Sequence, residues 1–151
     1  MAIKVIKLVF LTLIILCFSA LAGEDERTNN ATGTLIIEFV GLKSNDGNVK
    51  VALANSIQNY KNHKNPFRGL TIGIQQNSAT AIMEDVPFGD YAVKAFHDED
   101  ANDDLTTNFL GIPIEDYGFS NDARGMFGPP GWDNAKFKLD KDTLKIEITI
   151  K

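Results

Sequence analysis

The stretch that decides the fold is AKFKLDKDTLKIEITIK, residues 135–151. Apolar residues occupy every second position from Ala135 to Leu139 and again from Leu144 to Ile150, with polar residues, several of them lysines, between them. Successive side chains of a β-strand point to opposite faces, so this period predicts two strands that each bury one face.

The same alternation recurs upstream of this stretch. Alternating segments cover residues 34–39, 49–53, 70–75 and 91–96, and a weaker segment without a clean face covers 79–84. About seven short strands with turn signals between them, and no long helical pattern, are typical of an antiparallel sandwich. We therefore predict an all-β fold, a single antiparallel β-sandwich of about seven strands with one long irregular loop.

Local signals support this interpretation. Asn45-Asp46-Gly47 predicts a turn, because Asp and Gly tolerate the positive φ of hairpin turns, and residues 56–61 predict one helical turn. Tyr91 follows Val86-Pro87-Phe88-Gly89 at the entry to a strand, where a tyrosine hydroxyl can bond to the upstream backbone as in a tyrosine corner. We interpret Tyr91 as structural and not catalytic.

The N-terminal segment predicts export. A basic start, an apolar run at 8–18 and the small residues of Ala20-Leu21-Ala22 identify residues 1–22 as a cleaved signal peptide, with an uncleaved anchor as the alternative. Residues 23–32 are then a flexible lead-in, and residues 33–151 form the sandwich domain. Cleavage would leave a periplasmic or secreted protein without a membrane span.

Composition argues against several classes of partner. Cys17, the only cysteine, lies in the signal peptide, so the exported chain has neither disulfide nor thiol chemistry. Loss of Lys4 and Lys7 takes the net charge two units below −5, to −7. Nucleic-acid phosphates and anionic membrane surfaces are bound through Lys and Arg, so this acidic balance argues against both.

The longest connection has the densest charge. Residues 98–133 separate the strand that ends near His97 from the strand that starts near Asn134. A connection of this length is uncommon in a compact domain unless it is organised or functional. Five carboxylates stand in its first seven residues, DEDANDD. A bound cation would explain them, and a solvated acidic loop is the alternative.

The spacing of the oxygen-bearing side chains favours calcium. Asp98, Asp100, Asn102 and Asp104 stand at alternate positions, as in loops of the form D-x-D-x-[DN] that wrap a hard cation. We predict these four residues as metal ligands and calcium as the cofactor.

Two departures show that this loop is not an EF-hand. Asp103 stands where the sharp turn prefers glycine, and Phe109 stands where a bidentate glutamate is expected. The missing carboxylate would have to come from Glu115, Asp116 or Asp122.

The second half of the connection is rich in aromatic residues. Tyr117, Phe119, Phe127 and Trp132 lie near a Gly- and Pro-rich segment at 125–131. Such rings can stack on sugars or apolar ligands, or they can bury one another and hold the loop down. We predict Tyr117, Phe119 and Trp132 as a ligand-binding surface, with the loop mini-core as the alternative.

A hydrolase acting on envelope polymers is an alternative function. His97 beside Asp98 could serve as acid or base, although no G-x-S-x-G elbow accompanies the pair. This hypothesis requires an open cleft in which His97 and a carboxylate face a common point.

The long connection also carries a specific motif. Its residues are His97-Asp98, Asp100, Asn102, Thr107-Asn108, Gly111-Ile112-Pro113, Glu115, Tyr117-Gly118-Phe119-Ser120-Asn121 and Pro129-Pro130. This pattern resembles a family of exported bacterial proteins, domain of unknown function family 2141. The resemblance implies a signal peptide and an immunoglobulin- or transthyretin-like sandwich, similar to carboxypeptidase-regulatory domains. It implies no particular activity.

The sequence therefore predicts an exported module of the cell envelope, binding or structural in function. Its partner would be an unidentified envelope ligand or protein. Whether the chain is an enzyme stays open, with a non-enzymatic role favoured.

Overall fold

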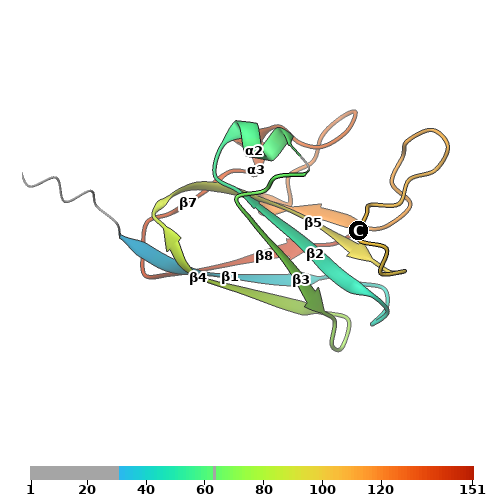
Figure 1. Cartoon of the computed structure of the whole chain (residues 1–151), viewed down its shortest axis with the longest axis horizontal. Helices are drawn as coiled ribbons and strands as arrows, with labels where there is room; N and C mark the ends of the chain where they lie inside the picture. The colour runs from blue at the N-terminus through green and yellow to red at the C-terminus, as the bar shows by residue number, and fades with distance from the viewer. Residues whose placement is uncertain (1–30, 63) are drawn as a thin grey trace, which may run out of the picture. The chain divides into compact units, whose positions relative to one another are not determined.

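The computed structural model describes residues 31–62 and 64–151, and in this part of the chain eight strands form two sheets that face each other (Figure 1). One sheet has the order β4-β1-β8, with β1 (Thr32–Val40), β4 (Ala79–Pro87) and β8 (Thr143–Thr149). The other has the order β3-β2-β5-β6, with β2 (Asn48–Ala54), β3 (Arg68–Gly73), β5 (Gly89–Asp98) and β6 (Tyr117–Phe119), and β7 (Phe137–Leu139) also pairs with β5. The predicted all-β sandwich is confirmed.

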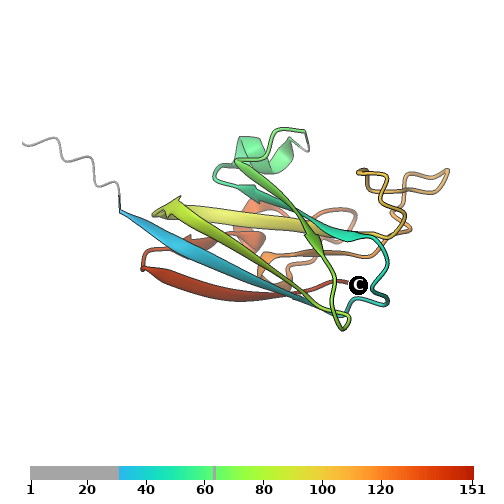
Figure 2. The same ribbon diagram turned by 60° about the horizontal axis from the view of Figure 1, so that its bottom comes forward.

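One strand pair departs from the antiparallel prediction. β1 pairs antiparallel with β4 but parallel with β8, with Leu35 opposite Leu144 and Phe39 opposite Ile148. Apolar and polar residues alternate in the same way in parallel and antiparallel strands, so the sequence pattern could not predict the direction of this pairing. Figure 2 shows β1 lying between β4 and β8.

The core lies between the inner faces of the two sheets. Leu35, Ile37 and Phe39 of β1 are fully buried, and they pack in one cluster with Val49 and Leu53 of β2. The strand that the sequence left without a clean face also alternates. β4 buries Ala79, Ala81 and Met83 at alternate positions, and Val86 after two exposed residues. The two small alanines hide this period in the sequence.

Local predictions agree with the structure at two positions. The Tyr91 hydroxyl donates a hydrogen bond to the backbone oxygen of Pro87 at 2.6 Å, which makes the expected tyrosine corner. Helix α2 (Ile57–Lys61) supplies the expected helical turn, and the Ser56 hydroxyl caps it by accepting from the backbone N–H of Asn59.

The long connection is not one loop. β6 divides it, because Tyr117–Phe119 pairs with β5 and places Phe119 opposite Lys94. The 3₁₀ turn η1 (Ser120–Asp122) follows β6, and helix α3 (Trp132–Ala135) precedes β7. Ala135, predicted to begin a strand, therefore ends a helical turn whose N–H groups bond back to Gly131 and Trp132.

The predicted signal peptide and residues 23–30 of the lead-in lie outside the described residues. β1 begins at Thr32, one residue before the predicted domain boundary. Within the described residues, no helix has the length and apolar character to cross a membrane.

Candidate functional site

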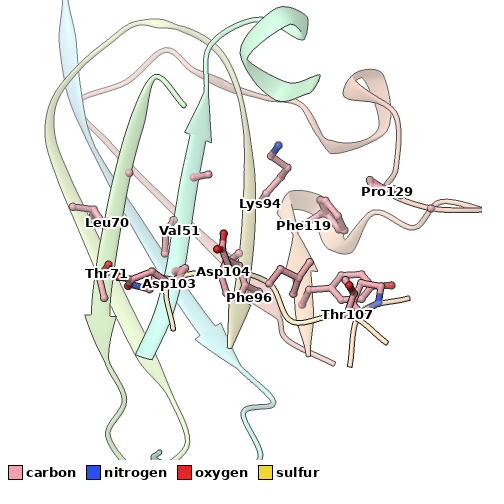
Figure 3. Close-up of a pocket in the computed structure, with 18 of the residues that line it drawn as sticks. Val51, Leu70, Thr71, Lys94, Phe96, Asp103, Asp104, Thr107, Phe119 and Pro129 are labelled. Atoms are coloured by element: carbon pink, nitrogen blue, oxygen red, sulfur yellow. Dashed lines mark hydrogen bonds and ion pairs between the residues drawn. The ribbon is translucent and has the colours of Figure 1, made fainter. Parts of the chain in front are cut away.

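A groove of about 730 Å³ lies over the outer face of the five-stranded sheet (Figure 3). The strand register places Gly69 of β3 and Lys94 of β5 on either side of Ala52 of β2. Gly69 has no side chain and Ala52 has only a methyl group. The sheet surface is therefore hollow at this row, while larger side chains stand around it.

The two parts of the long connection form the walls of the groove. We call residues 99–116 the first loop and residues 123–131 the second loop. The wall residues are Asp103, Asp104, Leu105, Thr107, Gly111 and Pro113 of the first loop and Gly128 and Pro129 of the second. Phe96, Tyr117 and Phe119 add aromatic surface from β5 and β6, so the lining is mostly apolar.

Lys94 is the cation nearest to helix α2 in this groove (Figure 3). Its Nζ donates to the backbone oxygen of Tyr60 at 2.7 Å and lies 5.2 Å from the centroid of the Tyr60 ring. The carbonyl and the ring face both stabilise the ammonium in this partly buried place. Burial lowers the pKa of Lys94.

Asp98 organises the start of the first loop. It is the last residue of β5, not the first residue of a loop as predicted, and its side chain is fully buried. Its Oδ1 accepts from the backbone N–H of Asn102 and its Oδ2 from that of Asp103, both at 3.0 Å. Lys50 Nζ lies 3.7 Å from Oδ2 and supplies a counter-charge. These charge-assisted contacts make the buried carboxylate tolerable.

The backbone after Asp98 turns sharply at two residues. Ala101 and Asp103 have φ values of 55° and 71°, in the left-handed region. Asp103 is the residue that stands where a calcium loop prefers glycine, and aspartate is among the residues that tolerate this conformation. Its carboxylate also pairs with Lys50, and this hydrogen bond raises the pKa of Lys50.

Three carboxylates converge beside this turn. Asp98, Asp100 and Glu115 each offer an oxygen, and the three oxygens lie within 4.8 Å of one another. Calcium binds oxygen at roughly 2.3–2.6 Å, so ligands on opposite sides of one ion stand about 5 Å apart. One calcium ion could therefore contact all three. Glu115 is one of the residues from which we expected the missing carboxylate.

The other two predicted ligands lie differently. Asn102 braces the loop, because its Nδ2 donates to Asp100 Oδ2 at 2.9 Å and its Oδ1 accepts from the backbone N–H of Asp104 at 2.7 Å. Asp104 is exposed and lines the groove, outside the carboxylate group. Their role as metal ligands stays a prediction.

His97 does not face the groove. Its side chain has no exposed surface, and its Nε2 lies 2.8 Å from the backbone oxygen of Asp46. Ser120 is likewise fully buried and bonds to Val93 and Ala135. The hydrolase hypothesis required His97 in an open cleft, and the structure gives it no accessible base at this position.

The predicted aromatic surface is split between two places. Tyr117 and Phe119 lie edge-to-face at 5.8 Å and line the groove. Trp132 packs edge-to-face with Tyr60, also at 5.8 Å, in a neighbouring hollow of about 280 Å³. These rings pack into a second small core, as the mini-core alternative expected. Phe127 does not, because it is 97% exposed.

Sequence reasoning missed the residues of the groove floor. Alternation placed Lys50 and Ala52 on one face of a strand, but only the register brings Gly69 and Lys94 beside them. A glycine within a strand is the one signal that was readable, because it often marks a close approach or a missing side chain.

The sequence profile of one protein family matches residues 37–147, and its description is an uncharacterized protein conserved in bacteria (DUF2141). The chain belongs to this family. The match begins in β1 and ends in β8, so this DUF2141 domain includes both loops and the groove. It confirms the resemblance that the motif in the long connection indicated. No curated protein matches the chain.

Proposed function

We propose that this DUF2141 protein is an exported binding module of the cell envelope, periplasmic or secreted, whose groove takes an apolar ligand. The observation that carries the proposal is the groove itself. Its volume of about 730 Å³ falls within the roughly 300–1,000 Å³ that is usual for ligand pockets. Apolar walls with a minority of polar groups also fit such pockets, and the polar groups here are Lys50, Thr71, Lys94, Asp103, Asp104 and Thr107.

The construction of the groove favours binding over a purely structural role. A structural module would gain stability by filling the space above Ala52 and Gly69 with side chains. Instead, the two loops border this space and leave it open to solvent. The half-buried rings of Phe96 and Tyr117 along one side offer flat surface to an apolar ligand.

A neutral fluorescent probe, N-phenyl-1-naphthylamine, tests the groove. We expect the mature protein to enhance its fluorescence, and Ala52→Trp to weaken binding about tenfold because the new ring fills the floor. Thr80→Trp is the matched control, since Thr80 is exposed on β4 of the other sheet. Both variants are checked for folding by circular dichroism. No binding, or equal binding by Ala52→Trp and the other proteins, refutes the proposal.

The second part of the proposal is that calcium orders the first loop through Asp98, Asp100 and Glu115. The support is their convergence within 4.8 Å. Glu115 accepts backbone N–H groups of Glu99 at 3.2 Å and Thr106 at 2.8 Å, so hydrogen bonds within the protein hold the loop around it. Carboxylate oxygens keep further lone pairs for a cation after such bonds.

Thermal melts in chelator and in 10 mM calcium test this part. A dissociation constant of about 10⁻⁴–10⁻³ M, as in extracellular modules, gives about 1.4–2.7 kcal/mol at that concentration and raises Tm by about 5–10 °C. Asp100→Asn should abolish the shift, while Glu84→Gln on the other sheet should keep it. Asp104→Asn distinguishes the two ligand sets, because only the alternating set requires Asp104. An unchanged Tm in calcium removes the metal from the proposal.

A further inference from the structure

The tips of both loops expose large apolar side chains. Phe109 of the first loop is 94% exposed and Phe127 of the second is 97% exposed. More than half of each of four neighbouring side chains is also exposed: Leu110, Ile112, Ile114 and Met126. A loop tip that exposes several large apolar residues marks an interaction site more often than chance exposure does.

The charge pattern shows what kind of surface would cover them. Residues 105–114 and 125–132 contain no charged residue, although 23% of the chain is charged. The acidic segment 98–104 stands directly before the first of these stretches, at the base of the loop. The tips therefore complement an uncharged apolar environment, and the base repels an anionic one.

Several backbone groups of the first tip are paired within the loop. The Asn108 side-chain oxygen accepts from the N–H groups of Leu110 at 2.9 Å and Ile112 at 3.1 Å. The Asn108 N–H bonds to the oxygen of Ile112, and the Gly111 N–H bonds to the oxygen of Asn108, both at 2.9 Å. Such pairing lowers the cost of bringing these backbone groups into an apolar environment.

We propose that the two loop tips insert into the interfacial layer of an electrically neutral lipid bilayer. Phe109 and Phe127 are the anchors, and the carboxylates at the base of the first loop limit the depth of insertion. Because both loops border the groove, docking would bring the groove close to the lipid. The inference does not depend on the groove binding a ligand.

Flotation of the mature protein with phosphatidylcholine vesicles tests the proposal. Burial of one phenyl ring corresponds to about a tenfold change in partitioning or more, so Phe109→Ser and Phe127→Ser should each weaken binding at least tenfold. Ile82→Ser is the matched control, because Ile82 is 58% exposed on β4 and should have no effect. Anionic lipid added at low salt should weaken binding.

Several outcomes would overturn the proposal. These are no flotation with neutral vesicles, binding that requires anionic lipid, and binding that is equal in the two phenylalanine variants and in Ile82→Ser. Ala52→Trp separates this inference from the groove proposal. If filling the groove floor abolishes flotation, the protein holds single lipids in the groove and the tips do not insert.

Discussion

Replacement of Ser120 by alanine tests how the first and second loops are held to the sandwich. β6 ends at Phe119, so the next ladder position beside Val93 has no backbone partner. The Ser120 hydroxyl fills that position. It accepts from the backbone N–H of Val93 at 2.9 Å and donates to the backbone oxygen of Ala135 at 2.6 Å. The residue is fully buried, so water cannot replace either bond.

Ser120→Ala leaves one buried donor and one buried acceptor without a partner. Each orphaned group costs about 1–3 kcal/mol, so we expect a loss of about 2–6 kcal/mol in the free energy of unfolding. For a domain of this size, that loss lowers Tm by about 6–24 °C. Urea denaturation followed by tryptophan fluorescence measures it, since Trp132 lies near Ala135 in helix α3.

Ser78→Ala is the matched control. Its hydroxyl donates to the backbone oxygen of Gln75 at 3.0 Å, but the residue is exposed and water can replace the bond. This change should cost less than about 0.5 kcal/mol. If Ser120→Ala costs no more than Ser78→Ala, the hydroxyl does not hold β5, η1 and α3 together as we argue.

Three further predictions concern the turns and the second core. In urea denaturation, Gly47→Ala should lower the free energy of unfolding by more than about 2 kcal/mol, because the φ of Gly47 is +63° and a Cβ there would lie 1.9 Å from the Asp98 backbone oxygen. Gly73→Ala is the control and should cost less than about 1 kcal/mol, because a Cβ at Gly73 meets nothing within 4 Å. Ala101→Gly should raise Tm by about 1–4 °C, since it relieves a left-handed alanine at φ 55°, and a lower Tm would contradict that strain. Burial raises the pKa of Tyr60 from 10.0 to about 12, so as the pH rises this side chain ionises in the unfolded chain before it ionises in the folded protein. The stability that Tyr60 contributes below pH 10 is therefore lost as the pH rises through about 12. Between pH 9 and pH 12, the denaturation midpoint of Tyr60→Phe should therefore fall less steeply with pH than that of the wild type. Equal slopes would show that Tyr60 does not titrate in this way.

Much of the fold could be predicted because the alternation of apolar and polar residues shows directly which side chains face the core. The inner faces of β1, β2 and β5 are the alternating residues of the sequence. The buried face of β4 could not be predicted, because its inward positions include the small residues Ala79 and Ala81 and alanine is only weakly apolar. It also failed for β6, because three residues are too few to show a period.

Only part of the candidate site could be predicted from the sequence. The oxygen spacing correctly drew attention to Asp98 and Asp100, since neighbours in sequence stay neighbours in a tight loop. Glu115 joins them because the first loop returns to its own base, and Glu115 was readable only as one of three candidates. The groove floor depends on register between strands, as for Ala52 and Gly69, and no local pattern specifies a register between distant segments.

The parallel pairing of β1 with β8 has a consequence for the time course of folding. The first described strand lies in the middle of its sheet, and one of its two edges is completed only by the last described strand. Contacts between such distant segments slow folding, and sandwiches that depend on them typically fold in roughly milliseconds to seconds. During synthesis the nascent chain keeps one edge of β1 unpaired until β8 emerges, so this sheet is completed only when the last described strand has been made.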